Sequence, residues 1–334
     1  MNDFSALLVA WQKQAGRHDL PWQGSNDAYS IWVSEIMLQQ TQVATVMPYY
    51  ERFMSSFPDV HRLASSHLDA VLAAWSGLGY YSRARNMHRT ARIIVEHHDG
   101  KFPDHPERLA EFPGIGRSTA AAIAVFAFSH RAAILDGNVK RVFSRVFGIE
   151  GYPGEKSVEA IMWKKAEELL PAAEIGRYTQ ALMDLGAGLC SRKNPNCGHC
   201  PLKSDCIAHI RGRVHELPQA RPKKALPSKE TTFLVSMREG LIRFERRPGS
   251  GVWAELLCFP EILPADVSNL HSVKTLPAFT HAFTHFRLKI NVVLAQAEGF
   301  GDGVWMTPEE GLASSIPNPV RKILEEVRIL SPWP

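Results

Sequence analysis

Long apolar runs are missing from this chain of 334 residues, and none approaches the roughly 20 residues that a helix needs to cross a bilayer. The first twenty residues also lack the basic, apolar and small segments of a secretion signal. Cysteine is scarce, with five residues in all, so a disulfide framework is not expected in a chain of this size. These absences predict a soluble, cytoplasmic protein whose thiols are reduced.

Net charge is also small, only +4 with histidine neutral, which argues against an evenly basic surface. Basic residues instead gather in two stretches. The first contains Arg83, Arg85, Arg89 and Arg92, and the second contains Arg211, Arg213, Arg221, Lys223, Lys224 and Lys229 among several prolines. Because the second stretch has few apolar residues, it predicts an extended connector, whose charges either follow a nucleic-acid backbone or are simply solvated.

The connector divides the chain into a domain at 1–212, a basic linker at 213–229 and a smaller domain at 230–334. Before it, apolar residues recur at helical spacing over 4–11, 31–38, 43–53, 68–75, 119–128 and 158–170. After it, strands rich in β-branched residues are predicted at 231–237, 241–245 and 288–295, with a last helix capped by Asn318. The expected fold is therefore a mainly α domain followed by a small α+β domain.

Four of the five cysteines fall within 17 residues, as Cys190, Cys197, Cys200 and Cys206. The segments between them are polar and prone to turns, so the four thiolates can converge on one metal centre. Spacing alone does not distinguish a structural zinc ion from an iron–sulfur cluster. Cys258 lies in a separate apolar run and is expected to be an ordinary buried thiol.

A second signal is Phe-Pro-Gly-Ile-Gly-Arg at 112–117, directly before an apolar run rich in small residues. Gly114 and Gly116 allow a tight turn and a close approach, and the next helix begins with amide groups free to bind a phosphate. The pattern predicts a helix-hairpin-helix element over about 107–128, which grips a DNA backbone without reading its sequence. A plain helix–helix turn is the alternative, since Gly-x-Gly alone is a weak motif.

Two carboxylates complete the signals. On a helix, the neighbours of Glu35 at three and four residues are mostly apolar, namely Ile31, Trp32, Leu38 and Gln39. Desolvation there would raise the pKa of Glu35 and keep it protonated as a general acid, although burial beside an unseen arginine is the alternative. Asp136, in Leu-Asp-Gly-Asn-Val at 135–139, suits a helix N-cap, and the same carboxylate can also face a substrate.

Taken together, these motifs resemble the MutY-type adenine DNA glycosylases of the helix-hairpin-helix superfamily. The resemblance covers nearly the whole chain, and its motifs are specific in combination. They are Leu-Pro-Trp at 20–22, Ser-Glu-Ile-Met-Leu-Gln-Gln-Thr-Gln at 34–42, Gly-Leu-Gly-Tyr-Tyr-Ser-Arg-Ala-Arg-Asn at 77–86, the hairpin at 112–118, Leu-Asp-Gly-Asn-Val at 135–139 and the cysteine segment.

The resemblance implies base excision repair by a monomer that binds double-stranded DNA at the nucleoid. The adenine to be removed lies opposite 8-oxoguanine or guanine and must be flipped out of the stack. Glu35 then protonates adenine at N7, Asp136 stabilises positive charge on the sugar, and Asn138 supports both. Gln40 and Tyr80 wedge into the duplex, and Trp22 and Gln180 contact adenine. The backbone is bound by Gly114, Gly116, Ser118, Arg192 and Lys193, and the four cysteines hold one 4Fe-4S cluster.

The paired carboxylates fit this chemistry, since an acid at the base and an anion at the sugar lower the barrier from both ends. We expect the apolar face of Glu35 and the polar setting of Asp136 to shift their pKa values in opposite directions. The nearest alternative is a bifunctional lyase of the endonuclease III type, which uses a lysine where this chain has Ser118; a hydroxyl cannot form the Schiff base. A non-enzymatic DNA-binding protein is the other alternative.

The last third resembles the Nudix-like domain of the same family. It lacks the Gly-x5-Glu-x7-Arg-Glu-x2-Glu-Glu string that holds magnesium in Nudix hydrolases, so it is expected to bind without hydrolysing. The family's Phe-Ser-His loop for 8-oxoguanine corresponds to Phe283, Thr284 and His285, with threonine in place of serine. Phe279-Thr280-His281 is an alternative register, and packing of these side chains on a sheet is the structural alternative.

Overall fold

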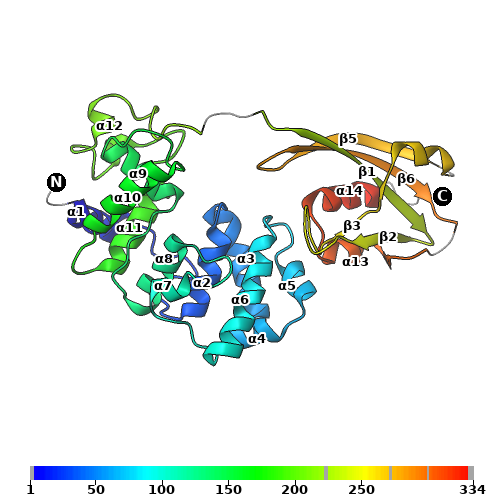
Figure 1. Ribbon diagram of the computed structural model, residues 1–334, viewed down its shortest axis with the longest axis horizontal. Coiled ribbons are helices and arrows are strands. Elements are labelled where there is room, and N and C mark those ends of the chain that lie inside the picture. The colour runs from blue at the N-terminus through cyan, green and yellow to red at the C-terminus, as the bar shows by residue number, and fades with distance from the viewer. Residues whose placement is uncertain (1–3, 222–224, 271–272, 299–300, 330–334) are drawn as a thin grey trace. The chain divides into compact units, whose positions relative to one another are not determined.

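The computed structural model describes residues 4–221, 225–270, 273–298 and 301–329. The chain forms two compact units, which are not consecutive pieces of the sequence. One unit contains Met1–Ser65 and Asn86–Lys223, and the other contains Ser66–Arg85 and Lys224–Pro334. The first is helical and the second is built on a sheet, as the ribbon in Figure 1 shows, so the expected fold class is confirmed.

Helix α2 lies deep in the core of the helical unit. In α2, nine of the eleven residues are buried, and Asp27 caps its N-terminus by accepting from the backbone N–H groups of Tyr29 and Ser30. Helix α8 packs on α2, and α9 packs on α11. The helices of this unit are α1 Phe4–Ala15, α2 Ala28–Leu38, α3 Val43–Ser56, α4 Val60–Ser65, α6 Ser82–His98, α7 Pro106–Leu109, α8 Arg117–Phe128, α9 Gly137–Val146, α10 Lys156–Glu168, α11 Ile175–Ala187, the 3-10 turn η1 Cys197–His199 and α12 Ile207–Ile210.

The second unit contains a mixed sheet with the strand order β3-β2-β1-β6-β5. Strands β1 and β6 run parallel, and the other pairs are antiparallel. The apolar face of α14 packs with the inner residues of the sheet in one core. The elements are α5 Leu68–Ala74, β1 Ser228–Arg238, β2 Leu241–Arg246, β3 Leu257–Cys258, β4 Glu261–Ile262, the 3-10 segment η2 Pro264–Asn269, β5 Lys274–Ala282, β6 Arg287–Gln296, β7 Val304–Met306, α13 Pro308–Ala313 and α14 Asn318–Ile329.

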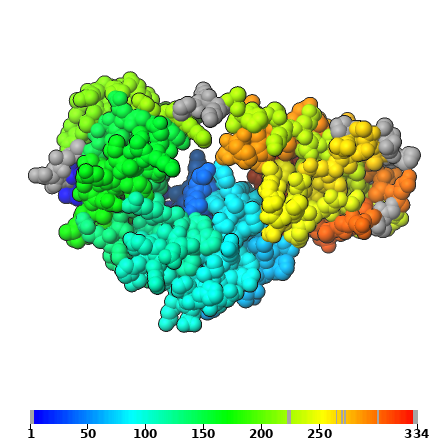
Figure 2. Space-filling view, in the orientation of Figure 1, coloured from blue at the N-terminus to red at the C-terminus, as the bar shows by residue number. Residues whose placement is uncertain are grey.

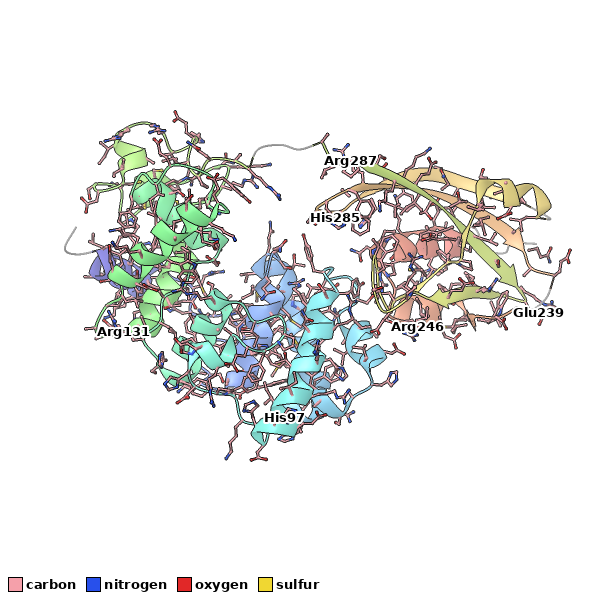
Figure 3. The ribbon with its side chains drawn as sticks, in the orientation of Figure 1. His97, Arg131, Glu239, Arg246, His285 and Arg287 are labelled. Atoms are coloured by element: carbon pink, nitrogen blue, oxygen red, sulfur yellow. The ribbon has the colours of Figure 1, made fainter. Side chains whose placement is uncertain are left out.

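Residues Ser66–Arg85 belong to this second unit, although they lie in the first third of the chain. Arg246 of β2, which Figure 3 labels, pairs with the carboxylate of Asp69 through two N–O contacts of 2.7 and 2.8 Å. The Tyr81 hydroxyl donates to the Ile316 carbonyl at 2.7 Å, and Arg85 donates to the Ala254 carbonyl at 2.9 Å. Division of the chain at the linker alone therefore does not describe the second unit.

The linker prediction is partly wrong, because the structured domains extend into 213–229 from both sides. Val214 and Leu217 are buried in the core of the helical unit, and Arg145 donates to the Leu217 carbonyl at 2.9 Å. At the other end, β1 already begins at Ser228. Val214 and Leu217 therefore anchor the start of this stretch on the helical unit, although its composition favoured an extended chain. Residues 222–224, with Lys223 and Lys224 of the basic patch, lie outside the described residues.

Candidate active site and cysteine segment

A cleft of about 1550 Å³ opens in the helical unit between α2, the glycine hairpin, the start of α9 and α11. Most residues that the sequence singled out for catalysis and DNA contact line it. They are Trp22, Glu35, Gln40, Gly114, Gly116, Ser118, Asp136, Asn138, Gln180 and Arg192. Lys193 is an exposed neighbour of Arg192, whereas Tyr80, Phe283, Thr284 and His285 belong to the second unit.

Glu35 lies on α2 with its side chain half-buried against the cleft. Its neighbours Ile31 and Trp32 are buried, with exposed fractions of 3% and 0%. Burial raises the pKa of Glu35 to about 8, and the negative charge of Asp136 adds to the rise. The raised pKa that the apolar helix face predicted is therefore present, and Glu35 holds its proton at neutral pH.

Asp136 caps α9, since its Oδ1 accepts from the Val139 backbone N–H at 2.8 Å. Burial raises the pKa of Asp136 as well, so the expectation of opposite shifts for the two carboxylates is wrong. The reason is that surrounding segments desolvate the Asp136 carboxyl group, although the turn has polar residues and Gly137 is exposed. Backbone N–H groups of Val139 and Asn138 and the charges of Arg141 and Lys140 oppose this rise. No such donor lowers the pKa of Glu35, and the negative charge of Asp136 raises it further.

The start of α9 is held against α11 and the cysteine segment. A Cβ on Gly186 of α11 would lie 2.5 Å from the Asn138 Cβ, so only glycine permits this approach. Arg141 donates to Asn138 Oδ1 at 2.8 Å, to the Gly186 carbonyl at 2.6 Å and to the Cys190 carbonyl at 2.8 Å. These bonds fix the Asn138 side chain and leave its amide nitrogen as a donor toward the cleft.

Gln180 is oriented by a pair that sequence reasoning missed. Its Nε2 donates to Asp184 Oδ1 at 2.8 Å, and Asp184 is bound in turn by the Arg17 Nε at 2.7 Å. Because the amide nitrogen is engaged, Gln180 presents its carbonyl oxygen as an acceptor in the cleft. The spacing of Gln180 and Asp184 by one helical turn was a usable signal. Arg17 lies 167 residues from Asp184 and could not be paired with it from sequence.

The hairpin between α7 and α8 uses its two glycines differently. Gly114 has a φ of +83°, and a Cβ there would lie 2.9 Å from the Asn86 Cβ. Gly116 has an extended backbone with φ −85°, precedes α8 as an N-cap without a side-chain cap, and has open space where a Cβ would stand. Its surroundings therefore suit a phosphate at the helix N-terminus. Ser118 Oγ accepts from the Leu135 N–H at 2.9 Å, which positions the segment before Asp136.

Gln40 and Tyr80 share an unusual backbone. Both are exposed non-glycine residues in the left-handed region, with φ values of +58° and +49°. Such conformations are costly and tend to occur at functional sites. The two side chains that the resemblance assigned to the duplex wedge thus both stand on tight, strained turns.

The four cysteines of the cysteine segment, residues 190–206, line one small cavity with apolar walls that include Val142, Leu185 and Val214. N–H donors already point at the sulfur atoms. Arg145 Nη1 lies 3.4 Å from Cys190 Sγ, Leu202 donates to Cys200, and Ala208 and His209 donate to Cys206. Such donors stabilise thiolates bound to a metal, whereas burial raises the pKa of the Cys200 and Cys206 thiols. The donor set suits a metal centre, although among the described residues no three such side chains already stand in a metal-binding arrangement.

The cysteine segment is attached to α9 by a buried arginine. Arg145, with an exposed fraction of 2%, donates to the Ser191 carbonyl at 2.7 Å and the Arg192 carbonyl at 3.3 Å. Figure 2 shows the yellow-green segment and the green helices forming one continuous surface in the helical unit. Cys258 lies apart from this group and is fully buried in the core of the second unit, as expected.

The predicted lesion loop forms the turn between β5 and β6, where Figure 3 labels His285 and Arg287. Phe283 stacks on Phe286 with ring centroids 4.5 Å apart and also contacts Trp253, whereas Thr284 and His285 are exposed. The alternative triplet at 279–281 lies inside β5 and pairs with β6. The aromatic residue is thus a core anchor, and the next two side chains are accessible.

The sequence and the fold of this chain were compared with those of known proteins. Residues 33–168 match the HhH-GPD superfamily of base excision DNA repair proteins, and residues 231–326 match a NUDIX domain. A thermostable thymine-DNA glycosylase superposes with a TM-score of 0.56 at 25% identity, over 63% of this chain and 96% of that one. An endonuclease III in a non-covalent complex with DNA superposes with a TM-score of 0.54, and at 20% identity it shows the shared fold.

Full-length sequence similarity points to one activity within this superfamily. An adenine DNA glycosylase of Buchnera aphidicola subsp. Acyrthosiphon pisum is 38% identical over 97% of both chains. The adenine DNA glycosylase of Rattus norvegicus is 44% identical over 64% of this chain and 44% of its own length. The chain belongs to the adenine DNA glycosylases, which are DNA-binding hydrolases acting on N-glycosidic bonds in base excision repair. This activity overturns the non-enzymatic alternative. In the described part of the chain, no helix is both long and apolar enough to span a bilayer.

We expect Glu35→Gln to remove a pH-dependent loss of stability. The pKa rises from 4.5 in the unfolded chain to about 8 in the folded protein, so the folded state binds the proton more tightly and loses stability as pH rises through this window. Glutamine does not ionise. The variant should match the native protein near pH 4.5 and exceed its free energy of unfolding by a few kcal/mol near pH 8. Denaturant unfolding at both pH values measures this, with the exposed Glu325→Gln as control; equal stabilities near pH 8 would contradict it.

The two hairpin glycines should separate DNA binding from folding. Gly116→Ala fits the free protein, so its melting temperature should stay unchanged while the added methyl group weakens duplex binding about tenfold. Gly114→Ala faces both a positive φ and the Asn86 side chain, and should lower stability by more than about 1 kcal/mol. Thermal unfolding and fluorescence anisotropy with labelled duplex test the pair. Equal loss of stability in both variants would be the opposing result.

Proposed function

We propose that this adenine DNA glycosylase removes adenine that lies opposite 8-oxoguanine or guanine, by acid catalysis at the base and electrostatic stabilisation at the sugar. The observation that carries the proposal is the pair of Glu35 and Asp136 in one cleft, with a pKa of about 8 at the first and hydrogen-bonded support at the second. Inside a duplex the bond is inaccessible, so adenine enters the cleft by flipping out of the stack.

Glu35 donates its proton to N7 of the flipped adenine, so the base departs as a neutral molecule when its bond to the sugar breaks. The electron pair of that bond goes to the base, and positive charge develops on the sugar. The Asp136 carboxylate stabilises this charge, and water then adds to the sugar carbon and releases a proton. In this step Asp136 is the ionised group and Glu35 the protonated one, which agrees with the rise that the charge of Asp136 causes in the pKa of Glu35.

Recognition of adenine follows from the oriented amide. The carbonyl oxygen of Gln180 is an acceptor for the exocyclic amino group of adenine, because Asp184 engages the amide nitrogen. Trp22, which packs edge-on against Tyr50 at 5.2 Å, offers an apolar wall of the same cleft. Asn138 holds the carboxylate turn through its bond to Arg141.

Contacts with the rest of the duplex are assigned from the family resemblance and from the places of the residues in the structure. The hairpin with Gly114, Gly116 and Ser118 binds a phosphate, and Arg192 and Lys193 bind the backbone beside it. Gln40 and Tyr80 fill the space of the flipped base and contact its partner. Phe283 anchors a loop from which Thr284 and His285 reach the oxidised guanine. The protein acts as a monomer in the cytoplasm, at the nucleoid.

The enzyme is proposed to be monofunctional. The Ser118 hydroxyl occupies the position of the lyase lysine and is engaged by the Leu135 N–H. A hydroxyl cannot form an imine with the sugar, so strand cleavage through a Schiff base is disfavoured. The product is therefore an abasic site in an intact strand.

The four cysteines are proposed to hold one 4Fe-4S cluster. Support comes from the shared cavity of Cys190, Cys197, Cys200 and Cys206, its apolar walls and the N–H donors aimed at three of the sulfur atoms. With all four thiolates engaged, the cluster has no open position for a substrate, and it serves to shape the loop that carries Arg192 and Lys193.

Single-turnover cleavage of duplexes with adenine opposite 8-oxoguanine, guanine or thymine tests the function. We expect base release opposite 8-oxoguanine and guanine, little opposite thymine, and strand breaks only after alkali treatment. Glu35→Gln should slow base release by about 10²–10⁴-fold while duplex affinity is retained, because the general acid is lost and the binding surface is not.

The exposed carboxylate variant Glu168→Gln is the matched control and should leave the rate unchanged. Near-normal base release by Glu35→Gln would refute the role of Glu35. Breaks without alkali would favour the lyase alternative, and equal rates on all three duplexes would refute the proposed partner specificity.

Metal analysis of the purified protein tests the cofactor. Iron and acid-labile sulfide in about equal amounts, near four of each per chain, with broad visible absorption are expected for the cluster. Replacement of Cys200 by serine should lower both contents together. A colourless protein that contains one zinc ion per chain would overturn the assignment.

A further inference from the structure

A tight turn between α5 and α6, residues 77–81, holds Tyr80 and is called the Tyr80 turn here. Gly77 and Gly79 have φ values of +100° and +75°, and Tyr80 itself has a φ of +49°. The Tyr80 side chain has an exposed fraction of 47%, which is large for an aromatic residue. A left-handed, exposed tyrosine persists only when its surroundings hold it in place.

Arg83 lies one turn further along the chain, at the start of α6, and is 7% exposed. Its guanidinium lies 5.3 Å from the Trp75 ring centroid and 5.4 Å from the Tyr80 ring centroid. These are cation–π distances to two rings at once. One planar group therefore connects a fully buried tryptophan with the exposed tyrosine.

The same guanidinium also binds the backbone of the turn. Arg83 Nη2 donates to the Gly79 carbonyl at 3.2 Å, and Trp75 Nε1 donates to that carbonyl at 3.0 Å. The Arg83 backbone N–H donates to the Tyr80 carbonyl at 2.9 Å. The peptide groups on both sides of the Tyr80 Cα are thus tied to Arg83.

Burial of this cation is unfavourable by itself, and desolvation lowers the pKa of Arg83 to about 10. A surface arginine that only contacted phosphates would have no reason to be buried between two rings. Lysine could supply the charge, but its compact ammonium group lacks the planar guanidinium that lies within reach of both rings and the carbonyl of the turn. The residue type therefore points to a geometric role.

We propose that Arg83 is the positioning residue that holds Tyr80 ready to enter the duplex. The inference rests on the proposed wedge role of Tyr80 and goes beyond it, since it assigns a function to a residue outside the cleft. Arg83 keeps the ring and its strained backbone fixed before DNA arrives, so the ordering cost is met during folding and not during binding. Loss of this support should weaken lesion recognition without changing the acid chemistry at Glu35.

A double-mutant cycle with Tyr80→Ala and Arg83→Lys tests the proposal. In the native background, Arg83→Lys should lower affinity for duplex with adenine opposite 8-oxoguanine about tenfold; in the Tyr80→Ala background, it should have almost no effect. Base release from saturated enzyme should change less than affinity. Arg92→Lys, on the exposed part of α6, is the matched control and should behave as native protein.

Trp75→Phe provides a second route to the same result. It keeps a ring beside the guanidinium, removes the donor to the Gly79 carbonyl and should also lose its effect when Tyr80 is alanine. Melting temperatures of all variants accompany the binding data. Equal effects of Arg83→Lys in both backgrounds would overturn the proposal. If Tyr80→Ala alone binds normally, the wedge role itself is wrong, which is a separate outcome.

Discussion

The hydrogen bonds from Arg141 and Arg145 to backbone carbonyls at 190–192 are the interactions on which the helical unit depends. They join three features that are distant in sequence: the carboxylate turn at the start of α9, the close passage of Gly186 past Asn138, and the first residues of the cysteine segment. Both guanidinium groups are one turn apart on a single helix, so the two attachments cannot move independently. A buried arginine without these acceptors would carry an unpaired charge into a core, and removal of either side would be strongly unfavourable.

The two carboxyl groups show that a site can treat two acids differently even when both are shielded from water. Both pKa values are raised by burial, and the difference between the groups comes from what opposes that rise. Asp136 has backbone donors and two cations nearby, which come from its own place at a helix N-terminus. For Glu35 no donor or cation opposes the effect of burial, and the charge of Asp136 adds to it. The helix that Asp136 caps thus also supplies the N–H groups and the cations that oppose the rise in the pKa of Asp136.

Much of the fold could be predicted because the helices and strands are local patterns. Apolar spacing predicted α1, α2, α3, α5, α8 and α10, and β-branched runs predicted β1, β2 and β6. The raised pKa of Glu35 followed from residues within one helical turn. By contrast, the raised pKa of Asp136 depends on burial by other segments, and the Arg17–Asp184 pair depends on contact across 167 residues. The short strands β3, β4 and β7 carry little pattern of their own, since each has only two or three residues.

The membership of Ser66–Arg85 in the second unit has a consequence for how the protein is made. A chain emerging from the ribosome carries this segment early, whereas its partners Arg246, Ala254 and Ile316 are synthesised more than 150 residues later. The ion pair of Asp69 and the hydrogen bonds that Tyr81 and Arg85 donate to the carbonyls of these partners therefore cannot form until those later residues have been synthesised. The contacts that hold the turn of Tyr80 itself are local, since they join Trp75, Gly79 and Arg83. This turn can therefore form early, whereas its attachment to the rest of the second unit waits for residues that are made much later.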